Sequence, residues 1–437
     1  MEKINAVLSG IVVPLLLTAT GIFYCFKLSF FHIFKPSAVL RGLRSDKTAG
    51  GVSSAKAVSL ALAGTLGVGN IVGVSSAIHL GGFGAVFWMW ISALIAMLLK
   101  YAEIVLAMRY RGSEGGSAMI YIKAFFSSRG LRRVGAVVSG IFALAFLLNS
   151  LTVGSMLQAN AIAEAADGVF NISPLIIGAV LCVFTLIMLR KGSRVMASIT
   201  EILVPLMSFG YIALSLAVMA RDVRGVGTAV ELIFANAFTP SSAIGGIGGY
   251  VFTSSVRYGV MRGLMSNEAG CGTAPAAHAL ANSKIPAKQG MWGIFEVFVD
   301  TVVLCTMTAI CVIMNYGDAE RFGGSYMMMT ISAYAASLGK LASVFISTAV
   351  LCFGLATIVC WAHYGSVCAK YLADRRWVEN AFIAVYCSCV AIGCFISSTQ
   401  LWGLADLAMG LMTVINLFVL VGMWKEVKEE TDVWIKK

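Results

Sequence analysis

The chain has 437 residues, of which 59% are hydrophobic and only 12% are charged, and its mean hydropathy is +0.87. A water-soluble domain of this size could not bury so much apolar surface, so the composition excludes a soluble protein and predicts one polytopic all-α membrane domain over residues 1–437. The formal net charge of +11 is interpreted as the basic excess of cytoplasmic loops. Nucleic-acid binding is excluded because basic and aromatic residues do not alternate along the chain.

Eleven apolar runs predict eleven membrane-spanning helices. In chain order they cover residues 6–30, 56–80, 84–109, 134–164, 172–189, 198–219, 242–266, 289–314, 341–369, 378–396 and 402–424. The first run is too long for the core of a signal peptide, so it is counted as a span. A further helix near 325–338 is too short to cross a membrane and is expected to lie on the surface as a cap.

The basic residues set the expected orientation. If the N-terminus is outside, most lysines and arginines fall in inside loops, and the outside loops hold only Lys3, Arg221, Arg224, Arg321 and Lys340. Lysine and arginine are enriched in cytoplasmic loops of membrane proteins. We therefore expect an outside N-terminus and a cytoplasmic tail at 425–437.

The second expected span contains a stretch that is unsuited to a continuous helix. Residues 64–73 read Gly-Thr-Leu-Gly-Val-Gly-Asn-Ile-Val-Gly, so glycines and two polar residues interrupt an apolar run. At membrane depth, backbone leaves the helix only where protein or a water-filled cavity satisfies its N–H and C=O groups. The stretch therefore predicts a broken helix and a binding site, which is typical of a transporter.

A second glycine-rich stretch, Gly245–Gly249, lies in the seventh expected span. Spans two to six (56–219) and seven to eleven (242–424) form two sets of five, and the odd number inverts the second set relative to the first. Interrupted helices at matching positions of two inverted halves indicate the site of a secondary transporter. The alternative interpretation of both glycine clusters is close packing between helices.

Two such breaks offer partners for both charges of an amino acid. A half-helix that begins after a break presents free N–H groups and the positive end of its dipole, which suits a carboxylate. A half-helix that ends before a break presents free carbonyls, which suit Na⁺ or an ammonium group. A small zwitterionic amino acid fits this pattern as cargo, and an ion channel is an alternative because broken helices also line pores.

Several short motifs are similar to those of one family. They are Gly69–Val74, Gly84–Trp90, Lys100 with Glu103, Arg257–Val260, Arg262–Leu264, the Ser-Asn-Glu-Ala-Gly run Ser266–Gly270, Asp300-Thr301 and Trp361–Gly365. Through these motifs, residues 50–425 resemble the alanine or glycine:cation symporter family, whose fold is similar to the leucine-transporter fold. The resemblance implies a five-plus-five inverted repeat, an extra N-terminal helix at 6–30, and a monomer in a prokaryotic cytoplasmic membrane.

The resemblance also implies a function. It points to sodium-driven import of alanine or glycine, D-alanine included, by alternating access, with Na⁺ as coupling ion and no other cofactor. Two positions depart from the family pattern: Val68 and Ala356 stand where the family usually has threonine. Hydroxyl groups there help to hold Na⁺ in transporters of this fold, so proton coupling is kept as an alternative.

The expected site residues lie at and around the two breaks. The expected substrate contacts are Thr65, Gly67, Gly69, Asn70, Gln158, Gly246, Ile247 and Trp361. The expected sodium ligands are Gly64, Leu66 and Thr357. Structural interpretations stand beside these: Asn70 is suited to cap the following half-helix, Gln158 to join two helices, and Trp361 to pack in the core.

Charged residues inside a membrane span are costly unless they are paired or functional. We expect four residues to form an inner-gate charge network: Arg109, Arg262, Glu268 and Asp300. Asp300 has two further interpretations, a pairing with Arg257 or Arg262 and a role in binding the ion. Lys100 and Glu103 are three residues apart on one helix and are expected to pair with each other.

An intramembrane enzyme is the alternative from another functional class. The chain contains no His-Glu-x-x-His motif, no Gly-x-Ser-x-Gly motif and no cluster of metal ligands. We therefore do not expect an enzyme.

Overall fold

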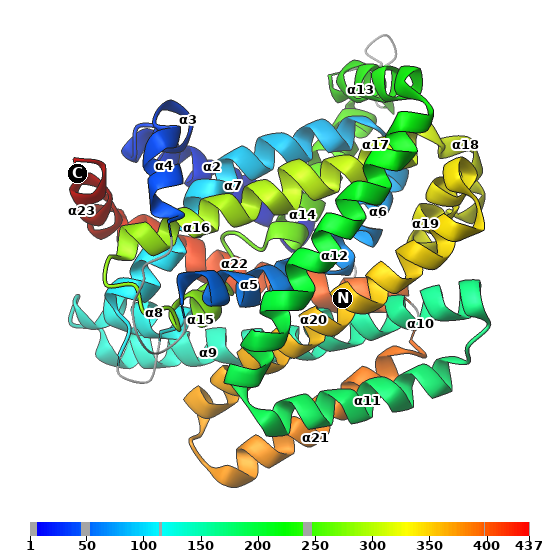
Figure 1. The fold of residues 1–437 in the computed structure, drawn as a ribbon. Helices are drawn as coiled ribbons and strands as arrows, with labels where there is room; N and C mark the ends of the chain where they lie inside the picture. Colours follow the sequence, from blue (N-terminus) through cyan, green and yellow to red (C-terminus); the bar gives the residue numbers. More distant parts are fainter. Residues whose placement is uncertain (1–6, 45–52, 113–115, 239–246, 397, 437) are drawn as a thin grey trace.

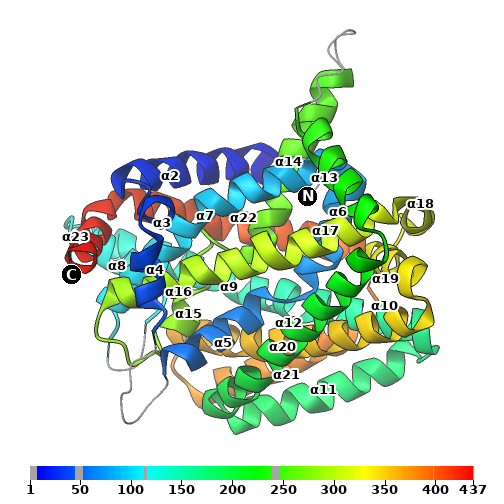
Figure 2. The same cartoon turned by 45° about the horizontal axis from the view of Figure 1, so that its top comes forward.

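The computed structural model describes residues 7–44, 53–112, 116–238, 247–396 and 398–436, and within these ranges it contains helices and connecting segments but no β-strand (Figure 1). The expected all-α class is confirmed. Long helices pack side by side in both views of the fold (Figure 1, Figure 2).

A helix occupies each position where a span is expected. These helices are α2 (Val13–Lys27), α5 (Ser54–Thr65) with α6 (Val72–Gly81), α7 (Gly84–Arg109), α9 (Arg132–Leu151) with α10 (Leu157–Phe170), α11 (Pro174–Lys191), α12 (Ser193–Arg221), α14 (Ile247–Asn267), α16 (Pro286–Val297) with α17 (Thr306–Met314), α20 (Lys340–Leu372), α21 (Arg376–Gly393) and α22 (Ser398–Gly422). Among the described residues, seven helices are long and apolar enough to cross a membrane, and the bent pair of α5 and α6 gives an eighth if it forms one span. The helices α2, α14 and α21 are shorter or carry charged residues, so the expected count of eleven stays a prediction.

Shorter helices complete the described chain. They are α3 (Phe31–Phe34), α4 (Pro36–Gly42), α8 (Ala118–Ser127), α13 (Val223–Ala237), α15 (Pro275–His278), α18 (Tyr316–Ala319), α19 (Tyr326–Leu338) and α23 (Trp424–Ile435). The expected cap is α19, which packs against α6, α17 and α20. It is more deeply seated than a surface helix, because the Tyr334 hydroxyl is buried and hydrogen-bonds Tyr211 and Ser215 of α12.

Burial separates the inner helices from the outer ones. In α7, 83% of the most apolar stretch is buried inside the protein, against 22% in α11 and 28% in α12. The apolar residues that α11 and α12 leave exposed suit contact with lipid. Figure 1 and Figure 2 show α11 beside α21 at one edge of the bundle, while α5 lies in its interior beside α12 and α20.

The first predicted break is confirmed. α5 ends at Thr65, the backbone at Gly67 is extended, and α6 begins at Val72 after a short 3₁₀ turn, with a 57° bend between the two segments. Only glycine fits at position 67, because a Cβ there would lie 2.7 Å from the Thr357 hydroxyl. The glycine therefore allows α20 to approach the interrupted backbone closely.

The second predicted break differs from the structure. Gly245 and Gly246 lie outside the described residues, and the rest of the predicted stretch falls in the first turn of α14. The described interruption comes after that helix, at residues 268–274, where Glu268, Gly270 and Gly272 all have positive φ. A glycine cluster at a helix start gives the same sequence signal as a mid-span break, and this caused the misplacement.

Two inner helices also contain a π-helical segment. π-helical segments at Thr152–Met156 and Phe298–Cys305 join α9 to α10 and α16 to α17. π-helical turns inside α-helices are frequent at functional sites. Both segments contribute to the polar surroundings of the first break: Gln158 follows one of them and Asp300 lies in the other.

Candidate functional site

A small cavity lies where the two interruptions meet. Its volume is about 20 Å³, and it is lined by Gly64, Thr65, Gly67, Gly69, Val153, Leu157, Gln158, Met265 and Glu268. A volume of this size holds about one water molecule. The described conformation is therefore nearly closed around the breaks, and four of the expected substrate contacts (Thr65, Gly67, Gly69 and Gln158) surround the same cavity.

Gln158 joins α10 to the first break. Its side-chain oxygen Oε1 accepts a hydrogen bond of 3.1 Å from the Val68 backbone N–H, and its Nε2 donates to the Val153 carbonyl at 3.1 Å. The side chain is buried, at 3% exposure. The helix-joining interpretation of Gln158 is therefore confirmed, and the amide also lines the cavity, where a contact with substrate stays a prediction.

The carbonyls at the end of α5 are already hydrogen-bonded. Thr357 of α20 donates to the Ala63 carbonyl at 2.8 Å, and the Trp361 indole Nε1–H donates to the Gly64 carbonyl at 3.3 Å. The Gly67 N–H donates to the Thr65 carbonyl at 2.8 Å. Thr357 thus lies at the first break, where its hydroxyl contacts the Ala63 carbonyl and the Phe353 carbonyl of its own helix. Its expected role with Gly64 and Leu66 as a sodium ligand stays a prediction.

Trp361 lies behind the cavity wall instead of in it. Its ring is fully buried, 5.8 Å from the Phe146 ring and 5.6 Å from the Tyr364 ring between centroids, and it is not among the residues that line the cavity. It also packs directly on α9–α10, because a Cβ at Gly154 would lie 2.2 Å from the Trp361 Cβ. Trp361 therefore supports Gly64 from outside.

Asp300 is the centre of a buried polar cluster beside the first break. Its carboxylate accepts hydrogen bonds from Asn70 at 2.7 Å, from Ser266 at 2.7 Å and from Thr301 at 2.8 Å. Asn70 does not cap α6; its amide nitrogen binds Asp300, and its buried Oδ1 has no hydrogen-bond partner among the described residues. Neutral donors thus surround the Asp300 carboxylate, and the Asn70 Oδ1 oxygen is available to a further ligand.

The expected pairing of Asp300 with an arginine is wrong. Arg262 instead lies 3.9 Å from Asp406 of α22, and the Arg257 guanidinium lies over the Tyr258 ring. Within the described ranges, Asp300 makes no ion pair with a basic side chain.

The expected inner-gate network is also wrong. Arg109 lies at the end of α7 and pairs with three acidic residues of the helical tail α23, whereas Arg262 pairs with α22. Glu268 lies at the cavity, where it accepts a hydrogen bond from Thr273, and Asp300 lies in its own cluster. No hydrogen bond or ion pair joins any two of these four residues in the described ranges, because each has other partners.

A buried ion pair that the sequence analysis missed connects the two interruptions. Lys100 of α7 contacts Glu296 of α16 at 2.7 Å, and both side chains are fully buried. Lys100 also donates to the Asn267 carbonyl at the end of α14, while Thr65 at the end of α5 donates to Glu296 at 3.2 Å. His278 of α15 lies 3.0 Å from the other Glu296 oxygen. The pair therefore holds the ends of both interrupted helices.

The expected Lys100–Glu103 pairing is wrong, because Lys100 forms its ion pair with Glu296 instead. Glu103 accepts hydrogen bonds from the Gly272 N–H and from the Asn416 side chain, so it holds the second interruption separately. Glu296 was visible in the sequence as a carboxylate inside the expected span 289–314, and intramembrane carboxylates call for a partner. The helix spacing favoured the wrong partner.

Ile247 is far from the cavity. It is the first residue of α14, whereas Met265 and Glu268 line the cavity at the other end of that helix. With a rise of 1.5 Å per residue, the separation along the helix is about 27 Å. The expected substrate contact at Ile247 is therefore wrong, and Gly246 lies outside the described residues.

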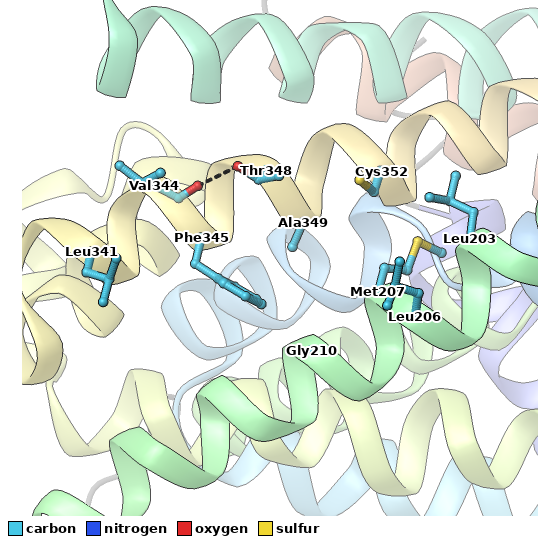
Figure 3. A pocket seen from close by; sticks show the side chains of 10 residues that line it. All are labelled: Leu203, Leu206, Met207, Gly210, Leu341, Val344, Phe345, Thr348, Ala349 and Cys352. Atoms are coloured by element: carbon cyan, nitrogen blue, oxygen red, sulfur yellow. Dashed lines mark hydrogen bonds between the residues drawn. The ribbon is translucent and has the colours of Figure 1, made fainter.

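A larger hollow lies elsewhere, between α12 and α20 (Figure 3). Its volume is about 370 Å³, and its walls are apolar except for Thr348, whose hydroxyl donates to the Val344 carbonyl of its own helix. Figure 3 shows the Phe345 ring pointing across the gap toward Gly210. A zwitterion needs polar partners, so this hollow suits a lipid chain rather than an amino acid.

Comparison with known proteins gives a match over the whole chain. The model of the sodium:alanine symporter family matches residues 1–437. The sodium/alanine symporter AgcS of Methanococcus maripaludis is 32% identical over 99% of this chain and 96% of its own length. The amino-acid carrier protein AlsT and the probable sodium/glutamine symporter GlnT, both of Bacillus subtilis, are 32% and 30% identical over 93% of this chain, and over 85% and 84% of their own lengths.

Solved structures support the fold alone. A Na⁺-coupled sialic acid symporter matches with a TM-score of 0.53 at 11% identity and covers 95% of this chain and 82% of its own. A manganese transporter of Eremococcus coleocola matches with a TM-score of 0.52 at 15% identity and covers 84% and 76%. The helices are therefore arranged as in membrane transporters.

Proposed function

The chain belongs to the sodium:alanine symporter family, and on this premise we propose that it imports alanine or glycine into the cell together with Na⁺. Membership makes the protein a sodium-coupled amino-acid symporter in a membrane, not an enzyme. The choice of a small cargo, D-alanine included, rests on one observation: apolar side chains of Val153, Leu157 and Met265 line the cavity between the two interruptions and leave little room beside the backbone. A named relative for glutamine means that membership alone does not set the size of the side chain.

The proposed binding site is the cavity at the first break. Thr65, Gly67, Gly69 and Gln158 line it, and the N-terminal end of α6 follows directly, so a substrate carboxylate would meet N–H groups and the positive end of a helix dipole. Asn70 and Trp361 act from behind this wall, by holding Asp300 and the Gly64 carbonyl. They are proposed as supporting residues rather than direct contacts.

Two positions are candidates for the sodium ion. One lies at the end of α5, near Thr357 and the backbone of Gly64 and Leu66, but the hydroxyls usual there are replaced by Val68 and Ala356.

The other candidate is the Asp300 cluster, and the observations favour it. The cluster offers a buried carboxylate without a basic partner in the described chain, two hydroxyls, and the unpartnered Asn70 oxygen. Hard cations prefer oxygen ligands, and a carboxylate supplies a full opposing charge. We therefore place Na⁺ at Asp300 in this proposal.

We further propose the architecture that alternating access needs. Two inverted sets of five helices, 56–219 and 242–424, would place the first break and the second interruption on either side of one site, with the helix at 6–30 outside the repeat. The distribution of basic residues supports an outside N-terminus and a cytoplasmic tail at 425–437 in a prokaryotic cytoplasmic membrane. The protein is proposed to act as a monomer.

Transport in proteoliposomes tests the proposal. Labelled alanine should enter under an inward Na⁺ gradient with saturable kinetics, and unlabelled glycine, serine or D-alanine should compete while glutamine should not. A proton gradient alone should not drive uptake. Equal uptake with and without a Na⁺ gradient would overturn sodium coupling, and a flux that does not saturate would indicate a channel.

A variant pair tests the site. Gln158→Ala should weaken alanine binding roughly 5- to 10-fold, because a hydrogen bond that fixes the break is worth about 1 kcal/mol. Asn160→Ala is the matched control: this amide is two residues away on α10 and donates to the Ile396 carbonyl at 2.8 Å, not to the break. Unchanged alanine affinity in Gln158→Ala would remove Gln158 from the site.

A further inference from the structure

The cavity has one charged wall. Of the described residues that line it, only Glu268 carries a charge. Glu268 is 2% exposed, and its Oε2 accepts a hydrogen bond of 2.8 Å from Thr273. Across the same small cavity lie the neutral groups of the first break, Thr65 and Gln158. A molecule in the cavity therefore touches a carboxylate on one side and neutral polar groups on the other.

No basic side chain forms an ion pair with Glu268 in the part of the chain that the structure describes. The nearest candidate, Lys100, is already held by the Glu296 carboxylate at 2.7 Å and by the Asn267 carbonyl at 2.7 Å. A buried carboxylate without a cation is unfavourable at membrane depth. A proton or a cation that enters the cavity removes this cost, so the carboxylate suits a positively charged ligand.

The alternative partners for a cation are occupied. The carbonyls of Ala63, Gly64 and Thr65 at the end of α5 accept hydrogen bonds from Thr357, Trp361 and the Gly67 N–H. Each carbonyl is a weaker partner for an ammonium group than a carboxylate, because a carbonyl oxygen carries only a partial negative charge and a carboxylate carries a full one. Glu268 is therefore the stronger partner at this cavity.

The backbone conformation of Glu268 is a second, independent observation that indicates a binding site. Its φ is +55°, in the left-handed region where glycine is unstrained and other residues pay on the order of 1 kcal/mol or more. Residues held in such conformations cluster at binding sites. Within the turn, one carboxylate oxygen accepts the Thr273 hydrogen bond, and the carboxylate also lines the cavity, where it can bind a ligand.

We propose that Glu268 binds the ammonium group of the transported amino acid, with the cargo's carboxylate facing the first break. This rests on the proposed function, amino-acid symport at this cavity. It makes Glu268 a specificity-determining residue: a cargo with a positive group beside its carboxylate is accepted, and an otherwise similar hydroxy acid is rejected.

The test compares alanine with L-lactate, in which a hydroxyl replaces the ammonium group. Equilibrium binding of labelled alanine, and its displacement by lactate, are measured at saturating Na⁺ on the purified full-length protein and on Glu268→Gln. We expect Glu268→Gln to bind alanine roughly 10- to 100-fold more weakly with lactate binding unchanged, because a hydrogen bond between charged groups is lost. The preference for alanine over lactate should fall by the same factor.

Glu103→Gln is the matched control. Glu103 is also fully buried and holds the second interruption, but it does not line the cavity. Its variant should keep the alanine-to-lactate preference. If Glu268→Gln does not fold, Glu268→Asp carries the test, because a shorter carboxylate should weaken alanine binding and leave lactate unaffected.

Three outcomes are decisive against the inference. An unchanged preference in Glu268→Gln, an equal loss for alanine and lactate, or unchanged alanine affinity in Glu268→Asp would each overturn it. Wild-type protein that binds no small neutral amino acid would overturn the proposed function and the inference with it, whereas wild-type binding with an unaffected variant overturns the inference alone.

Discussion

The chain leaves the helix twice beside one cavity, and different chemistry holds the two interruptions. The first, at residues 66–71, is held mainly by neutral groups of Thr357, Trp361 and Gln158. Carboxylates contact it only through the side chains of Thr65 and Asn70, which donate to Glu296 and Asp300. The second, at residues 268–274, is held by the charged side chains of Lys100 and Glu103. A neutral hydrogen bond contributes about 1 kcal/mol, whereas breaking a buried charge pair costs several. The first interruption is thus the part that can remodel, and the second is the anchor.

The largest expected effect comes from removing the anchor. Lys100→Met leaves Glu296 buried without its cation and frees the Asn267 carbonyl, so the free energy of unfolding should fall by about 3–5 kcal/mol. Thermal or denaturant unfolding of the detergent-solubilised protein measures this. Lys56→Met is the control: Lys56 pairs with Glu201 at 3.1 Å, but both side chains are more than one-third exposed, so the change should stay within about 1 kcal/mol. Similar losses in both variants would contradict the comparison.

An intermediate effect is expected where α20 supports the first interruption. Gly154→Ala places a Cβ 2.2 Å from the Trp361 Cβ, which should cost about 1–3 kcal/mol of stability and weaken alanine binding by moving Trp361 off the Gly64 carbonyl. Gly140→Ala on α9 meets no atom within 4 Å and should be about 0.5–1 kcal/mol more stable than wild type. The same unfolding and binding measurements apply. A stable Gly154→Ala protein with normal binding would show that the tryptophan support is dispensable.

The smallest expected effect separates the two sodium candidates. Asp300→Asn removes the only full charge of its cluster and should raise the Na⁺ concentration for half-maximal alanine binding roughly tenfold or more.

Thr357→Val should change that concentration less than about threefold, since only a neutral hydroxyl shared between the Ala63 and Phe353 carbonyls is lost. Thr348→Val is its control, because that hydroxyl only bonds Val344 within α20. Sodium titrations of alanine binding decide between the positions: a larger effect at Thr357 than at Asp300 would move the ion to the end of α5.

The sequence reveals the first interruption because its signal is local. Glycines and polar residues inside an apolar run have no place in a simple spanning helix, and the 57° bend lies there. The second interruption has a weaker local signal, since Glu268, Gly270 and Gly272 follow a helix of ordinary composition. The cluster at 245–249 is richer in glycine, so the second break is predicted there and not at residues 268–274.

Local sequence patterns do not identify which residues of different helices bind one another. Spacing on α7 suggests that Lys100 binds Glu103, yet its partner Glu296 lies far along the chain on α16. The same holds for Asp300, which binds Asn70 and Ser266 in place of an arginine. Residues that meet at the cavity come from α5, α10 and α14, and their meeting depends on packing that no single helix specifies.

The Lys100–Glu296 pair has a consequence for the order of synthesis and insertion. α7 precedes α16 in the chain, so Lys100 first enters the membrane without Glu296, and a charged side chain in a spanning helix is costly to insert. The long apolar run of α7 offsets this cost. In the nascent first half, Lys100 therefore has only Glu103, three residues along the same helix, as a nearby opposite charge, and its ion pair with Glu296 forms when α16 arrives.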